Sequence, residues 1–117
     1  KIYLYWLWAT WCGPCIRQQP HLKKLEEHYK GKNIEFVSIS LDEKKDYLSW
    51  KKMVKDKGLP GIQLISEDGW GSLASSYGIN GIPTFVLISP NGNILSWDSY
   101  NPSDSEIYDI LDYLLKW

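Results

Sequence analysis

The chain has 117 residues, enough for one domain with its own hydrophobic core. Its formal net charge is −1, so the composition gives no electrostatic sign of binding to nucleic acid or to an anionic membrane. Lys1 leads straight into an apolar run without the charged segment and cleavage site of a signal peptide. We expect residues 1–117 to form a single domain whose N-terminal elements have been trimmed.

The first part of the chain alternates a predicted strand, helix and strand. Residues 2–8 form a continuous apolar and aromatic run, which is typical of a strand buried on both faces. Apolar side chains at helical spacing then continue to Lys30, where Gly31 ends the pattern. Pro20 lies inside this helix and predicts a kink. Residues 34–41 predict the second strand.

A lysine-rich segment that opens at Asp42 follows. Its apolar stripe predicts a helix ending near Gly58, and its six lysines alternate with acidic residues, as on a solvated helix face. Residues 62–65 predict a short strand. Residues 71–77 predict a short helix that Gly78 ends.

The last third of the chain predicts a hairpin and a helix. Residues 84–88 predict a strand, and a Pro-Asn-Gly turn leads into another strand over residues 94–97. Residues 103–106 (Ser-Asp-Ser-Glu) predict a capping box before a final amphipathic helix. The order β-α-β-α-β-α-β-β-α predicts an α/β fold with a partly parallel sheet and a terminal antiparallel hairpin.

Both cysteines of the chain, Cys12 and Cys15, lie at the junction between the first strand and the first helix. A thiol at a helix N-terminus faces unpaired backbone N–H groups and the positive end of the helix dipole, so its thiolate is favoured. The thiolate is the nucleophile of disulfide exchange, and a second cysteine one turn away can resolve the mixed disulfide. The spacing therefore indicates a redox centre.

Two other interpretations of the cysteine pair are weaker. A structural disulfide that closes so short a loop adds little stability, because the closure entropy is small. A zinc or copper site usually needs four ligands, and the only histidines, His21 and His28, project from the helix that follows.

Two motifs resemble the thioredoxin family. Residues 8–15 (Trp-Ala-Thr-Trp-Cys-Gly-Pro-Cys) look like its active site, and residues 81–84 (Gly-Ile-Pro-Thr) resemble its loop with a cis proline that faces the cysteines. Pro20 falls where the family kinks its first active-site helix. The segment between Asp42 and Pro83 is longer than in a plain thioredoxin, which is similar to the TlpA-like branch of the family.

The resemblance implies a thioredoxin-like three-layer α/β/α sandwich. Its mixed sheet would carry a central helix-strand insertion and a C-terminal β-hairpin plus helix. The implied function is a thiol-disulfide oxidoreductase, acting as a reductant without a cofactor or a metal, in the bacterial periplasm or cell envelope. The implied partners are protein thiols and disulfides and an upstream thiol electron donor, with no nucleic acid. We expect a monomer without a membrane segment in this chain.

The site residues lie in the two motifs. We expect Cys12 to be the more exposed thiol and to attack a partner disulfide, and Cys15 to resolve the mixed disulfide. By resemblance, the backbone of Ile82 would pair with the partner's extended chain beside cis-Pro83. Trp11 either packs over the active-site loop or contacts the partner. The candidate residues are Trp11, Cys12, Gly13, Pro14, Cys15, Ile82 and Pro83.

The chain departs from the family at three charged positions. Thioredoxin keeps a buried Asp where this chain has Trp6, and the lysine that accompanies it falls at Ser38. Many TlpA-like reductants carry a Glu where this chain has Gln18. The proton route to Cys15 is therefore not assigned by sequence. A binding domain without turnover and a peroxidase-like redoxin remain as alternative functions.

Overall fold

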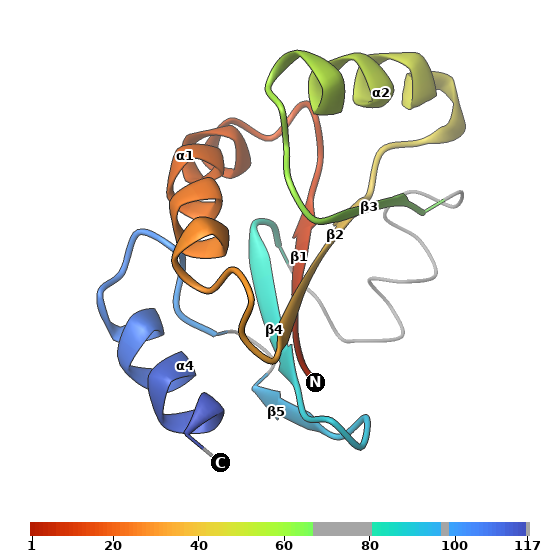
Figure 1. The fold of residues 1–117 in the computed structure, drawn as a ribbon. Helices are drawn as coiled ribbons and strands as arrows, with labels where there is room; N and C mark the ends of the chain where they lie inside the picture. Colours follow the sequence, from red (N-terminus) through yellow and green to blue (C-terminus); the bar gives the residue numbers. More distant parts are fainter. Residues whose placement is uncertain (67–80, 97–98, 117) are drawn as a thin grey trace.

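The structure, a computed structural model, describes residues 1–66, 81–96 and 99–116. Its centre is a five-stranded sheet in the order β3-β2-β1-β4-β5 (Figure 1). β2 pairs parallel with both β1 and β3, whereas β4 pairs antiparallel with both β1 and β5. The strands are β1 (Ile2–Trp8), β2 (Ile34–Ser40), β3 (Ile62–Ile65), β4 (Thr84–Ile88) and β5 (Ile94–Ser96).

Helices α1 (Gly13–His28) and α4 (Glu106–Leu115) cover one face of the sheet (Figure 1). Helix α2 (Tyr47–Asp56) follows a short 3-10 turn, η1 (Lys44–Asp46), and lies beyond the end of the sheet where α1 begins. In the described chain no helix is both long and apolar enough to cross a membrane.

The core forms between the central strand and the two helices on that face. Leu4, Trp6 and Trp8 alternate along β1, and all three pack in one cluster with Leu25 of α1 and Leu111 of α4. The rings of Trp6 and Trp8 stack at a centroid distance of 4.9 Å. This aromatic stack lies in the same cluster as both cysteines.

The structure confirms the predicted strands and the mixed, thioredoxin-like α/β architecture. The predicted helix of the lysine-rich segment is α2, which begins at Tyr47, the first residue of its apolar stripe. Asp42, where that segment opens, is buried just after the end of β2. The predicted helix over residues 71–77, Gly78 and the last residue of the strand over 94–97 lie outside the described residues.

The predicted capping box before α4 is wrong. The N-cap of α4 is Ser105, and its side chain makes no capping hydrogen bond. Ser103 is instead bound to α1: Gln18 Nε2 donates to its hydroxyl at 3.0 Å, and its N–H donates to Gln18 Oε1 at 3.2 Å. A contact with a distant helix thus replaces the local cap.

Candidate active site

The two cysteines form a disulfide at the N-terminal end of α1, with their Cα atoms 5.2 Å apart. Cys12 is the N-cap of the helix, and its Sγ accepts a hydrogen bond from the backbone N–H of Cys15 at 3.2 Å. Pro14 occupies the first turn, where its missing N–H leaves no helical bond unmade. The helix therefore presents backbone donors to the sulfur of Cys12, which favours negative charge there after reduction.

A tight turn connects β1 to this disulfide. The N–H of Cys12 donates to the carbonyl oxygen of Ala9 at 3.1 Å, so Thr10 and Trp11 are the central residues of the turn. Trp11 is 62% exposed. Cys12 is 5% exposed and Cys15 is 0% exposed, so solvent reaches the pair at the Cys12 end.

The second motif lies against the first. The carbonyl oxygen of Ile82 is 3.8 Å from Cys12 Sγ, although the two residues are 70 positions apart in the sequence. The peptide bond between Ile82 and Pro83 is cis. Thr84 Oγ1 donates to the carbonyl oxygen of Gly81 and closes the loop on itself. The structure thus brings the Cys-Gly-Pro-Cys and Gly-Ile-Pro-Thr segments together at one end of the sheet.

Uncharged residues occupy the positions at which the resemblance to thioredoxin implied charge. Trp6 is 1% exposed and lies directly across from Ser38 in the parallel pairing of β1 and β2. Gln18 is bound to Ser103, away from the disulfide. The indole N–H groups of Trp6 and Trp8 are buried without a hydrogen-bond partner in the described chain.

One buried carboxylate beside the active-site turn was missed by the sequence analysis. Asp42 follows β2 and is 0% exposed, and its oxygens accept hydrogen bonds from the N–H and the hydroxyl of Thr10. The signal was available, because residues that follow neighbouring parallel strands meet at the same sheet edge. Asp42 follows β2 just as Thr10 follows β1.

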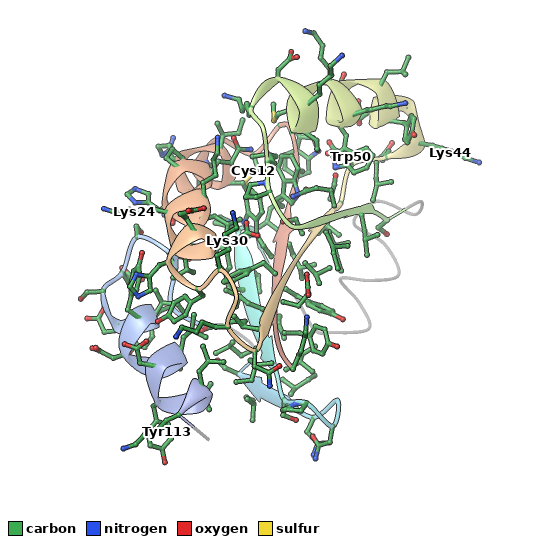
Figure 2. The ribbon with its side chains drawn as sticks, in the orientation of Figure 1. Cys12, Lys24, Lys30, Lys44, Trp50 and Tyr113 are labelled. Atoms are coloured by element: carbon green, nitrogen blue, oxygen red, sulfur yellow. A yellow bond between two sulfur atoms is a disulfide. The ribbon has the colours of Figure 1, made fainter. Side chains whose placement is uncertain are left out.

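Helix α2 also contributes to this end of the molecule. Trp50 packs against the cluster that contains both cysteines, and Figure 2 shows Cys12 and Trp50 at the same end. Gln19 of α1 contacts Met53 of α2, with its Nε2 3.8 Å from the sulfur. Both histidines are exposed on α1, and the described residues contain no cluster of three or more potential metal ligands.

Comparisons with known proteins agree with this geometry. A family profile described as thioredoxin-like matches residues 1–94. The chain is 34% identical to the thiol-disulfide oxidoreductase ResA of Oceanobacillus iheyensis, over 74% of this chain and 43% of that protein. The chain therefore spans about half the length of the ResA relatives it matches.

Two solved structures show the same architecture over nearly the whole chain. A candidate thiol-disulfide oxidoreductase from Bacteroides vulgatus is 42% identical, with a TM-score of 0.87 over 99% of this chain and 74% of that one. A thiol-disulfide oxidoreductase from Bacteroides fragilis is 32% identical, with a TM-score of 0.81 over 95% of this chain and 81% of that one.

Proposed function

Because the chain belongs to the thioredoxin-like family, we propose that it catalyses thiol-disulfide exchange with other proteins through Cys12 and Cys15. The observation that carries the proposal is the disulfide at the N-terminus of α1, with Cys12 against the loop of Ile82 and Pro83. A structural disulfide would not require a helix N-terminus, an exposed flanking Trp11 and a facing backbone segment.

The exchange balances as two substitutions at sulfur. The thiolate of Cys12 attacks one sulfur of a partner disulfide, forms a mixed disulfide and expels the other partner sulfur as a thiolate. The thiolate of Cys15 then attacks Cys12 Sγ, releases the second partner thiol and closes the disulfide that the structure contains. Two electrons pass from the Cys12–Cys15 dithiol to the partner, which is reduced.

The partner would bind as an extended segment across the active-site end. The backbone of Ile82 would pair with that segment beside Pro83, in the manner of strand addition, and Trp11 would cover it from the side of α1. Gly13 and Pro14 restrict the loop between the cysteines and hold Cys15 one turn below Cys12. An extended backbone carries little sequence information, so this arrangement suits many protein disulfides.

Direction and location are part of the same proposal. We assign the protein as a reductant whose Cys12–Cys15 disulfide is reduced again by an upstream thiol donor. The reason is that Gly13-Pro14 between the cysteines resembles the dipeptide of reducing thioredoxins. The likeness to ResA supports a place outside the cytoplasm, in the periplasm or cell envelope. A redox titration of the pair in dithiothreitol or glutathione buffers tests the direction. A potential close to that of strong oxidants, about −120 mV, would contradict it.

Reduction of insulin by the purified protein, with dithiothreitol as the electron donor, tests the activity. We expect turnover above the rate with dithiothreitol alone, and we expect Cys12→Ser to abolish it. Cys15→Ser removes the resolving thiol and should also stop turnover. Unchanged activity in Cys12→Ser would contradict the mechanism. Hydrogen peroxide consumption faster than disulfide reduction would favour a peroxidase instead.

A further inference from the structure

We propose that Asp42 is a positioning residue for the attacking thiol: its buried carboxylate holds the turn that places Cys12 at the N-terminus of α1. The inference rests on the proposed function, since Cys12 is the sulfur that would attack the partner. It assigns a role at the site to a charge that lies outside both sequence motifs.

Hydrogen-bond donors surround the buried carboxylate of Asp42. The N–H of Thr10 lies 3.1 Å from Oδ2 and 3.3 Å from Oδ1, and the Thr10 hydroxyl donates to Oδ1 at 2.7 Å. The Ser40 hydroxyl donates to Oδ2 and accepts from the N–H of Asp42 at 3.0 Å. Burying a carboxylate is unfavourable unless hydrogen bonds replace its water, and these donors replace it.

Thr10 connects the hydrogen bonds of Asp42 to the active site. It is a central residue of the turn that the N–H of Cys12 closes on the carbonyl oxygen of Ala9 at 3.1 Å. The neighbouring strand ends are joined by the N–H of Leu41, which donates to the carbonyl oxygen of Trp8 at 2.7 Å. Asp42 therefore ties the turn before the nucleophile to the end of β2.

The position of Cys12 decides how well its thiolate is stabilised. Cys12 is the N-cap of α1, and in the disulfide form its sulfur accepts a hydrogen bond from the backbone N–H of Cys15 at 3.2 Å. The N–H groups of a helix N-terminus favour negative charge only at close range. A looser turn would let the sulfur move away from these donors and would raise the pKa of the Cys12 thiol. The negative charge of Asp42 acts in the opposite sense, because a like charge disfavours a thiolate.

Loss of positioning would raise the pKa of the Cys12 thiol, whereas loss of the Asp42 charge alone would lower it. An experiment can therefore separate the two roles of Asp42. Thr10→Val keeps the shape of the side chain and the charge of Asp42 but removes the hydroxyl bond, and Thr10→Ser restores that hydroxyl. Asp42→Asn removes the charge. Asp104→Asn is the matched control, because Asp104 Oδ2 accepts the N–H of Asn101 at 3.0 Å in the loop before α4. Arg17 brings a positive charge to the loop between the cysteines, since its Nη1 lies 3.5 Å from the position that a Cβ on Gly13 would occupy. This charge is the same in every variant.

The readout is the pH profile of alkylation of the reduced full chain by iodoacetamide, with peptide mapping to assign the signal to Cys12. In Thr10→Val we expect the midpoint to rise by about half a pH unit, which is about threefold less thiolate below the midpoint. Asp42→Asn should move the midpoint in the same direction. Thr10→Ser and Asp104→Asn should stay at the wild-type midpoint.

Two results would overturn the proposal. An unchanged Cys12 midpoint in Thr10→Val, with a lower melting temperature, would limit these bonds to a role in stability. A lower midpoint in Asp42→Asn would mean that the residue acts through its charge. If Asp42→Asn does not fold, the Thr10→Val and Thr10→Ser pair decides. Failure of the proposed function is separate, because the wild type would then lack insulin turnover while the alkylation profile could still be measured.

Discussion

Replacing Glu26 with Gln should stabilise the protein at neutral and alkaline pH. Glu26 lies on α1, and its Oε2 is buried without a hydrogen-bond partner in the described chain. Its Oε1 lies against the backbone of Gly61, only 2.5 Å from where a Cβ on that glycine would be. Burial, with a smaller contribution from the charge of Glu35, raises the pKa of Glu26 from 4.5 to about 7.

The sign follows from proton binding. Between pH 4.5 and about 7 the folded state holds a proton on Glu26 that the unfolded chain has released, so the free energy of unfolding falls as the pH rises. The full shift corresponds to about 3 kcal/mol at about 1.4 kcal/mol per pKa unit. Because water still reaches part of the residue, screening reduces the expected loss to about 1–2 kcal/mol above neutral pH.

Urea unfolding at a series of pH values from about 4 to 8 measures this effect. We expect Glu26→Gln to match the wild type at the acid end and to exceed it by about 1–2 kcal/mol at pH 8, because the amide cannot ionise. Glu27→Gln, at an exposed position next to it on α1, is the control and should follow the wild type throughout. Parallel curves for Glu26→Gln and the wild type would refute the reasoning.

Two further predictions concern a hydrogen-bonded tyrosine hydroxyl and a close approach to the backbone of a glycine. Tyr29→Phe should lower the free energy of unfolding in urea by about 1–2 kcal/mol, because the single hydroxyl proton of Tyr29 is shared between two acceptors, Asp112 Oδ1 at 2.8 Å and the carbonyl oxygen of Tyr108 at 3.0 Å. An unchanged urea midpoint would contradict this. Gly61→Ala should destabilise more than Gly92→Ala, since both glycines have positive φ (78° and 88°) but a Cβ meets neighbouring atoms only at Gly61. Equal losses in the two glycine variants would show that the space beside Gly61 is not limiting.

Local sequence patterns were sufficient for the strands, whereas the arrangement of the site motifs was expected only from the family resemblance. Residues 62–65 and 84–88 are apolar runs between turn residues, and both are strands in the structure. The proximity of Cys12 to Ile82 was expected from the resemblance of two motifs, since no local pattern relates residues 70 positions apart. In the structure the carbonyl oxygen of Ile82 lies 3.8 Å from Cys12 Sγ.

The residues that were missed depend on contacts between distant segments. The sequence marks Asp42 only as the opening of a lysine-rich segment, whereas its partner Thr10 is 32 positions away. The pairing of Trp8 with Ser40 at the ends of β1 and β2 brings these residues together. The capping box failed for the same reason, since Ser103 binds Gln18, 85 positions earlier.

The central claim is that Cys12 attacks and Cys15 resolves, and trapping the mixed disulfide tests it most directly. The Cys15→Ser variant, reduced and then mixed with a disulfide-bonded peptide, should accumulate a mixed disulfide that mass spectrometry maps to Cys12. The Cys12→Ser variant should accumulate little, because Cys15 is 0% exposed. Trapping on Cys15 in Cys12→Ser at a comparable yield, or no trapping in either variant, would contradict the account.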